Sequence, residues 1–272
     1  MTYQTVQGED VPALGLGTWQ ITGEDCYEAV RDALEIGYRH IDTAQVYENE
    51  DDVGRALADA GVDRDDVFLV TKVWPSNLAP ENLPRSVERS LDKLQTDYVD
   101  LLYVHWPSGD FEMNGTMEAL RAQQDEGRAH RLGVSNFTPD LLEAALDRAP
   151  LFALQVEYHP FLDQRELIGM CRRHDLLFTS YSPLARGAVL ESDLLDTLAE
   201  AHGKHPAQVA LRWQVQQDHV AAIPKASSEE HRRSNFDLFD FELSPEEMDA
   251  IFELARGERV VAPDSLAPAA WQ

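Results

Sequence analysis

Short apolar runs alternate along this chain with longer stretches in which apolar residues recur at helical spacing. Runs rich in β-branched and aromatic residues predict eight strands, over 37–43, 67–73, 98–106, 129–135, 152–159, 176–182, 220–225 and 239–243. The amphipathic stretches predict helices over 25–36, 49–60, 82–94, 116–126, 138–148, 163–174, 206–216 and 228–235. In the third of these helices, Val87, Leu91 and Leu94 fall on one face. Helix starts are marked by Thr138-Pro139 and by the capping box of residues 244–247.

Eight strands alternating with helices predict an α/β fold in which a single (β/α)8 TIM barrel buries both faces of its parallel sheet. The same alternation also fits an open doubly wound sheet, but the pattern favours the closed barrel. Ahead of the barrel, residues 5–6 and 14–16 flank Gly8 and predict an N-terminal β-hairpin across one barrel end. The sequence contains no internal repeat and no composition break, so residues 1–272 are predicted to form one domain.

The charge balance is strongly acidic. Asp and Glu number 49 against 23 Lys and Arg, which gives a formal net charge of −26 and a pI of about 4.5. Such a chain repels nucleic acid and anionic membranes, which bind proteins through Lys and Arg. Lysine occurs only at positions 72, 93, 204 and 225. Dense carboxylates with so little lysine suit concentrated salt, where the Debye length falls to roughly 3 Å, so we hypothesise a halophilic source.

Cysteine content and the N-terminal segment bear on location. Cys26 and Cys171 are the only cysteines, too few for a disulfide framework or a four-sulfur zinc site. No apolar run approaches bilayer length, and residues 1–6 lack the features of a signal peptide. The expectation is a cytoplasmic monomer that binds neither nucleic acid nor membrane and holds no metal.

Ionisable side chains stand where the predicted strands end. Asp42, Lys72 and His105 end the first three predicted strands, and Tyr47 lies five residues beyond Asp42. Each has an ordinary structural explanation when taken alone: a helix cap, an exposed strand-end lysine, a core histidine. The carboxyl ends of barrel strands share one mouth, so three such groups in succession favour a common site.

The segments around these residues carry a family resemblance. They read IDTAQVYENE at 41–50, TKVW at 71–74, YVHWP at 103–107, GVSNF at 133–137, QVEYHP at 155–160, YSPL at 181–184 and IPKAS at 223–227. Together they closely resemble the aldo-keto reductases, in particular the prokaryotic 2,5-diketo-D-gluconate reductase-like branch. The resemblance runs from Gly15 to beyond Lys225 and implies a barrel that reduces carbonyl groups with a nicotinamide cofactor.

By this resemblance the catalytic residues are Asp42, Tyr47, Lys72 and His105. A tyrosine suits proton donation to a developing alkoxide, because its ordinary pKa near 10 keeps it protonated at neutral pH. The Lys72 ammonium is expected to favour the tyrosinate, with Asp42 holding that ammonium in place. His105 is expected to polarise and orient the carbonyl oxygen.

The resemblance also implies a set of cofactor contacts for NADPH. They are Ser135, Asn136 and Gln155 at the carboxamide, Tyr181 stacked on the nicotinamide ring, Ser182, Leu184 and Arg186 along the pyrophosphate, and Lys225, Ala226, Ser227, Ser228, His231 and Asn235 around the adenosine phosphate. The family usually has an arginine where this chain has His231 and a glutamate where it has Ser234. The next residue, Arg232, points about 100° away around a helix. A phosphate is best held by a permanent cation, so we expect a weakened NADPH preference and substantial activity with NADH.

Trp19, Trp74 and Trp106 are expected to line an apolar pocket for a small carbonyl substrate. The short segment 107–115 indicates an open site for small aldehydes, dicarbonyls or keto-sugar acids, and Trp271 is a candidate to fold over its mouth. Two other function classes stay open. One is a metal-dependent barrel hydrolase or isomerase, with ligands drawn from Asp42, His105, Glu157 and His159. The other is a regulatory subunit that binds the nucleotide without turnover.

Overall fold

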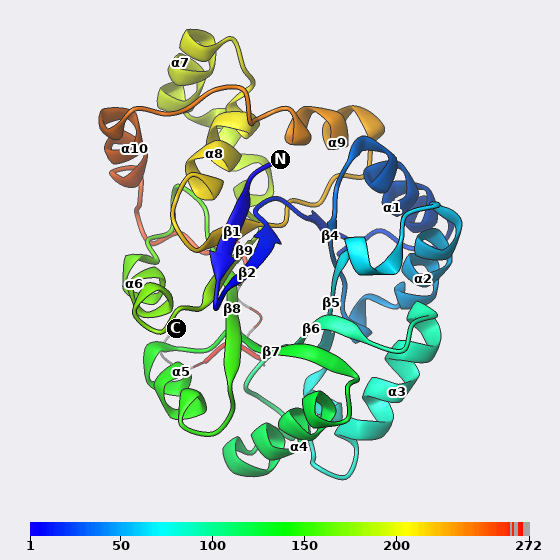
Figure 1. The fold of residues 1–272 in the computed structure, drawn as a ribbon. Helices are drawn as coiled ribbons and strands as arrows, with labels where there is room; N and C mark the ends of the chain where they lie inside the picture. Colours follow the sequence, from blue (N-terminus) through cyan, green and yellow to red (C-terminus); the bar gives the residue numbers. More distant parts are fainter. Residues whose placement is uncertain (262, 264–265, 269–272) are drawn as a thin grey trace.

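A parallel sheet forms the centre of the molecule in the computed structural model, which describes residues 1–261, 263 and 266–268 (Figure 1). Its strands are β3 (Leu16–Gly17), β4 (His40–Asp42), β5 (Phe68–Val73), β6 (Val99–Val104), β7 (Ala129–Ser135), β8 (Leu151–Glu157), β9 (Leu177–Tyr181) and β10 (Val220–Ala222). Neighbours pair in chain order, and parallel bridges join Leu14 to Ala222 and Gly17 to Lys225. The sheet therefore closes on itself, and the predicted (β/α)8 barrel is confirmed.

Helices surround this sheet (Figure 1). They are α1 (Glu24–Ile36), α2 (Glu50–Asp59), α3 (Leu83–Leu94), α4 (Met113–Asp125), α5 (Pro139–Leu146), α6 (Arg165–Arg173), α7 (Asp193–His202), α8 (Pro206–Val215), α9 (Glu229–Phe236) and α10 (Pro245–Phe252). The predicted helices are found with small shifts of their ends, and Ser244 and Glu247 form the predicted capping box of α10. Helix α7 was not predicted. It follows a 3-10 segment, η4 (Ala185–Glu191), that leaves the barrel after β9.

Two strand predictions are wrong. The first barrel strand is β3, in a segment predicted as an arm of the hairpin, and residues 239–243 form no strand. A Cβ on Gly17 would lie only 2.7 Å from the Ile223 carbonyl oxygen, so this two-residue strand depends on glycine and shows no alternation. The aromatic residues of 239–243 pack on helices instead: the ring centroid of Phe239 lies 5.9 Å from that of Phe236. Asp42 and Lys72 thus belong to the second and third barrel strands, and His105 directly follows the fourth.

The N-terminal hairpin consists of β1 (Tyr3–Val6) and β2 (Glu9–Pro12), paired antiparallel around Gly8. The hairpin prediction is confirmed, but its second strand is 9–12 rather than 14–16. Val6 and Val11 pack against Leu101 and Phe152 inside the barrel. Because the hairpin fills the end where the strands begin, the opposite, carboxyl end is left for the site.

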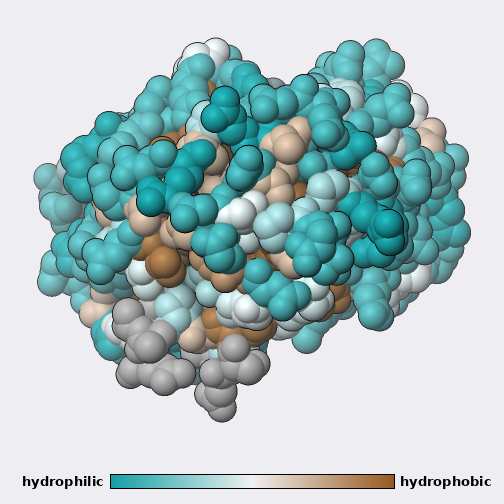
Figure 2. Space-filling model, turned by 90° about the horizontal axis from the view of Figure 1, so that it is seen from below, coloured by the Kyte–Doolittle hydropathy of each residue, from teal (hydrophilic) through white to brown (hydrophobic). Residues whose placement is uncertain are grey.

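The surface seen in Figure 2 is rich in polar side chains. Figure 2 shows one face that is mostly hydrophilic, with apolar residues scattered across it. Both cysteines are buried, and burial raises the pKa of the Cys26 and Cys171 thiols to about 12. Within the described part of the chain, no helix combines the length and apolar content needed to cross a bilayer.

Candidate active site

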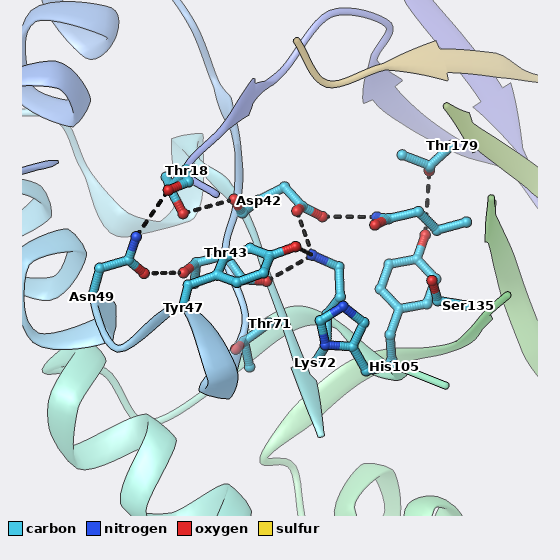
Figure 3. Close-up of polar contacts among 12 residues, drawn as sticks. Thr18, Asp42, Thr43, Tyr47, Asn49, Thr71, Lys72, His105, Ser135 and Thr179 are labelled. Carbon is cyan, nitrogen blue, oxygen red and sulfur yellow. Dashed lines mark hydrogen bonds and ion pairs between the residues drawn. The ribbon is translucent and has the colours of Figure 1, made fainter. Parts of the chain in front are cut away.

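A buried ammonium lies at the centre of the barrel mouth (Figure 3). Lys72, on β5, donates from Nζ to Asp42 Oδ1 at 2.5 Å, to the Thr43 carbonyl oxygen at 2.9 Å and to the Tyr47 hydroxyl at 3.3 Å. These bonds use all three N–H donors of the ammonium. Burial lowers the pKa of Lys72, but the charge of Asp42 and the bonds to Asp42 and Tyr47 together outweigh it, so the pKa is raised. The ammonium therefore stays charged at neutral pH.

Tyr47 is carried by η1 (Gln45–Tyr47), a 3-10 turn separated from β4 by two residues. Gln45 fixes this turn: its Oε1 accepts from the Trp74 backbone N–H at 3.0 Å and from Asn77 at 2.9 Å. The Gln45 Nε2 donates to Ser86, on α3. Sequence reasoning did not single out Gln45, although its position two residues before the predicted proton donor was the available signal.

The pKa of Tyr47 reflects a competition. Burial raises it, the positive charge of Lys72 lowers it, and the balance lies above the ordinary value of 10. Lys72 thus acts in the expected direction, but the expectation omitted burial, which outweighs it. The phenol consequently keeps its proton at neutral pH.

His105 follows β6 and faces Tyr47. Its ring centroid lies 5.8 Å from that of Tyr47 and 5.2 Å from that of Trp74, edge-on to both. Burial and the charge of Lys72 hold the pKa of His105 well below its usual range, so the imidazole is neutral. Its Nδ1 is buried and has no hydrogen-bond partner among the residues that the structure describes. The structure therefore brings together the four side chains predicted as catalytic.

The predicted carboxamide contacts join the same network. Asn136 donates to the His105 carbonyl oxygen and to Ser135 Oγ, each at 3.0 Å, and accepts from the Tyr181 hydroxyl at 2.7 Å. A left-handed backbone at Asn136, with φ of 65°, turns its side chain back toward β6. Burial raises the pKa of Tyr181 well above its ordinary value, so this phenol also remains protonated.

Gln155 makes a contact that sequence reasoning missed. Its Nε2 donates to Asp42 Oδ2 at 2.8 Å, while Asp42 Oδ1 faces Lys72. Both residues are almost fully buried. Gln155, near the end of β8, therefore supports the carboxylate from across the barrel.

The three predicted pocket tryptophans occupy different environments. Trp74 packs against His105. Trp106 is buried, with only 4% of its surface exposed. Trp19 is 38% exposed, and the Arg186 guanidinium lies 5.2 Å from its ring centroid. Ser182 and Arg186 both have a left-handed backbone, with φ of 49° and 52°, and Leu184 between them is partly buried. The segment after β9 thus reaches the loop that carries Trp19.

The segment after β10 holds the residues predicted around the adenosine phosphate. Lys225, Ser227, Ser228 and His231 are exposed, whereas Ala226 and Asn235 are buried. Lys225 Nζ donates to Ser227 Oγ at 3.3 Å, and Ser228 Oγ caps α9 by accepting from the His231 backbone N–H at 3.2 Å. Lys225 and His231 are therefore both open to solvent.

Arg232 points away from that surface. It is 5% exposed, and its Nε donates to Asp32 Oδ2, on α1, at 2.6 Å. Its Nη1 donates to the carbonyl oxygens of Ala226 and Ser227 at 3.1 and 2.9 Å. Arg232 therefore stabilises the loop after β10 from inside and does not replace the arginine missing at His231.

The residues considered as metal ligands are engaged in other contacts. Glu157 accepts from His159 Nε2 at 3.0 Å and from the backbone N–H groups of Val260 and Val261 at 2.6 and 3.1 Å. Across the described ranges, no group of three or more His, Cys, Asp and Glu is placed to hold a metal ion. Glu157 instead fastens the segment after α10 to the barrel, and Trp271 lies outside the described residues.

Comparisons with known proteins agree with this geometry. Residues 13–256 match the model of the aldo/keto reductase family. The chain is 40% identical over 260 residues to an aldo-keto reductase of Mycolicibacterium smegmatis, covering 94% of each chain. It is also 40% identical over 269 residues to the glyoxal reductase of Bacillus subtilis, covering 97% of each chain. The chain also resembles a solved structure that is described as a candidate 2,5-diketo-D-gluconic acid reductase B. The two superpose with a TM-score of 0.95 at 44% identity, over 99% of this chain and 97% of that one. The chain belongs to the aldo/keto reductase family.

Proposed function

We propose that this aldo-keto reductase reduces small aldehydes and ketones, dicarbonyl compounds in particular, with Tyr47 as the proton donor. The proposal is carried by one observation: the Tyr47 hydroxyl lies 3.3 Å from a buried ammonium whose charge Asp42 holds in place. The similarity to a protein named glyoxal reductase supports a small dicarbonyl substrate. The similarity to the candidate diketogluconic acid reductase makes keto-sugar acids the second class to test.

The mechanism follows from the protonation states of the site. A bound nicotinamide cofactor supplies the hydride that adds to the carbonyl carbon. As the carbonyl oxygen gains negative charge, Tyr47 gives it the proton that burial has kept on the phenol. Lys72 then stabilises the phenolate that remains, and each unit by which it lowers the pKa of Tyr47 is worth about 1.4 kcal/mol.

His105 takes the second position on the carbonyl oxygen. A neutral imidazole has one N–H donor, and a proton on Nδ1 would bury that donor without an acceptor. We therefore assign the proton to Nε2, from which His105 donates to the developing oxyanion. Hydride addition and proton donation then act on the two atoms of one carbonyl group.

The chemistry of the polar side chains at the barrel mouth fits a nicotinamide dinucleotide. Ser135, Asn136 and Gln155 present hydroxyl and amide groups at the ends of β7 and β8, close to the Tyr181 ring. Arg186 and Lys225 provide cations on the loops after β9 and β10, suited to the phosphates. These residues would hold the cofactor so that its reactive ring faces Tyr47 and His105.

We infer that NADPH binds without strong discrimination against NADH. The exposed groups that we expect around a 2′-phosphate are those of Lys225, Ser227, Ser228 and His231, whereas Arg232 is paired with Asp32. The carboxylates of Glu229 and Glu230 also begin α9 and oppose an added negative charge. A single lysine aided by hydroxyls favours a phosphate less than a bidentate arginine does.

The acidic surface supports a proposal about the working environment. A net charge of −26 repels other copies of the chain, which favours a monomer, and it is tolerated best where salt screens self-repulsion. We place the enzyme in a cytoplasm of high salt content.

The test follows the absorbance of NADPH and of NADH in concentrated KCl with glyoxal, methylglyoxal, a keto-sugar acid and a bulky aromatic ketone. Turnover is expected with the small dicarbonyls and both cofactors. Tyr47→Phe is expected to bind cofactor normally, judged by quenching of protein fluorescence, and to lose nearly all turnover. Full activity of Tyr47→Phe would refute the assigned role of Tyr47.

A further inference from the structure

We propose that Asn49 is a positioning residue that sets Lys72 against Tyr47 and, with the same amide group, holds the loop that carries Trp19. The proposal rests on the proposed role of Tyr47 as proton donor. It concerns how the fold fixes the distance between that phenol and the ammonium beside it.

Asn49 is placed to cap a helix but does not cap it. It directly precedes α2, and asparagine is among the preferred N-cap residues because its side chain can accept from the first free N–H groups. Here the side chain makes no cap hydrogen bond, and the residue is fully buried. Its amide is turned toward the barrel mouth instead (Figure 3). Helix capping therefore does not explain the side chain.

The oxygen of the amide acts on the lysine. Asn49 Oδ1 accepts from Thr43 Oγ1 at 2.7 Å, and Thr43 is also fully buried. The Thr43 carbonyl oxygen in turn accepts from Lys72 Nζ at 2.9 Å. Of the three acceptors around Nζ, the Tyr47 hydroxyl is the farthest, at 3.3 Å. A shift of the Thr43 carbonyl would therefore change the weakest contact of the ammonium first, which is the contact that matters for proton transfer.

The nitrogen of the same amide acts on the loop after β3. Asn49 Nδ2 donates to the carbonyl oxygens of Thr18 at 3.0 Å and Ile21 at 2.7 Å. These carbonyls stand on either side of Trp19 and Gln20, and Gln20 has a left-handed backbone with φ of 60°. The Thr18 side chain bonds back to the Asp42 carbonyl oxygen at 3.1 Å. The backbone on both sides of Trp19, the exposed aromatic residue of this loop, is thereby held by the same amide that binds Thr43 beside the ammonium.

The two sets of contacts can be disrupted separately. We call the contact of Asn49 Oδ1 with Thr43 the lysine arm, and the contacts of Asn49 Nδ2 with the carbonyls of Thr18 and Ile21 the loop arm. Thr43→Val keeps the shape of the side chain and removes the hydroxyl that Asn49 binds, whereas Thr43→Ser keeps that hydroxyl. Asn49→Asp keeps an acceptor for Thr43 but loses both N–H donors, so it places an oxygen opposite the Thr18 and Ile21 carbonyls. The first change acts on the lysine arm and the second on the loop arm.

The lysine arm is tested by steady-state kinetics over a range of pH. Relative to Thr43→Ser, Thr43→Val is expected to lower kcat by about tenfold, because a small displacement of an aligned group is costly, with little change in KM for the carbonyl. The alkaline fall of kcat should move to higher pH, since a less well placed Lys72 stabilises the Tyr47 phenolate less. If Thr43 were only structural, Thr43→Val would lower Tm and leave kcat and the pH profile equal to those of Thr43→Ser, which would overturn the proposal.

The loop arm is tested by the KM for the carbonyl substrate. Asn49→Asp is expected to raise KM for the carbonyl substrate more than it lowers kcat, because it releases the Trp19 loop. Equal KM values in the mutant and the wild type would overturn this half of the proposal. Should Asn49→Asp fail to fold, iodide quenching of the fluorescence that Trp19→Phe removes, compared in Asn49→Ser and the wild type, reports the same release. A quenching constant that does not change in Asn49→Ser would count against it.

One measurement separates this proposal from the proposed function. The ultraviolet difference spectrum between each enzyme and its Tyr47→Phe counterpart reports ionisation of Tyr47 alone, without turnover. Tyr47 should ionise at higher pH in Thr43→Val than in Thr43→Ser even if no tested carbonyl is reduced. Identical titrations would overturn the positioning role, whereas absence of turnover in the wild type would count only against the proposed function.

Discussion

Removing the charge of Asp42 should destabilise the fold as well as stop the reaction. Lys72 Nζ lies 2.5 Å from Asp42 Oδ1, and the two side chains are 0% and 2% exposed, so water does not screen the pair. In Asp42→Asn the ammonium would keep only neutral partners, Thr43 and Tyr47. Breaking a buried pair by removing one partner typically costs about 3–5 kcal/mol. At about 2–4 °C per kcal/mol for a domain of this size, Tm should fall by roughly 6–20 °C.

The assay is a double-mutant cycle in which unfolding is followed by heat and by denaturant. Asp42→Asn is compared with Lys72→Met and with the double variant, all at neutral pH and constant salt. Lys72→Met leaves a buried carboxylate that keeps, among the residues that the structure describes, the hydrogen bond from Gln155, so it should also destabilise. The double variant leaves no unpaired charge and should be more stable than Asp42→Asn, although inactive.

Two results would refute this reasoning. A loss of less than about 1 kcal/mol in Asp42→Asn would mean that the ammonium does not need its carboxylate inside the barrel. A double variant as unstable as the sum of the two single variants would mean that the side chains contribute independently, and that the short contact between them carries little coupling energy.

Three further predictions use other measurements. His231→Arg should raise the ratio of kcat/KM for NADPH to that for NADH by about tenfold, since a permanent bidentate cation then faces the phosphate; an unchanged ratio in steady-state kinetics would contradict this. The folded state raises the pKa of Lys72 above its ordinary value of 10.5, so the stability it contributes is complete below that value and is lost as pH rises through the raised pKa. Above pH 10.5, Tm should therefore fall more steeply in the wild type than in Lys72→Met, and parallel curves would argue against it. Because 49 acidic residues face 23 basic ones, Tm should rise as KCl is added to dilute buffer; a Tm insensitive to salt would remove the argument for a halophilic source.

The meeting of Asp42, Lys72 and His105 could be predicted because barrel topology converts order along the chain into position around one mouth. Each residue stands at or near the carboxyl end of its own strand, and consecutive strands are neighbours. The prediction survived an error in numbering the strands, since only their adjacency matters. The position of Tyr47 depends in addition on η1 and on Gln45, a side chain whose partners come from two other parts of the chain.

Features that depend on the balance between opposing effects could not be predicted. The sequence shows that a lysine accompanies Tyr47, but not that burial outweighs that lysine in setting the pKa of the phenol.

The strand β3 could not be predicted because a close approach of backbones, rather than a pattern of side chains, defines it. Residues 239–243 alternate like a strand because Phe239 and Phe241 pack against neighbouring helices.

Arg232 illustrates why local geometry is not enough to judge a substitution at the cofactor site. Helical periodicity places it about 100° from His231, which leaves open whether a long side chain could swing back to a phosphate. Its partner Asp32 lies 200 residues earlier in the chain and is only 16% exposed. To reach a phosphate, the guanidinium would have to leave this carboxylate largely buried and unpaired and release the carbonyl oxygens of Ala226 and Ser227. Through those carbonyls Arg232 holds the loop that carries Lys225, so recruiting Arg232 would disturb the cation that we propose for the phosphate. The buried contacts of Arg232 beneath α9 therefore support the weak preference for NADPH over NADH that we expect from His231.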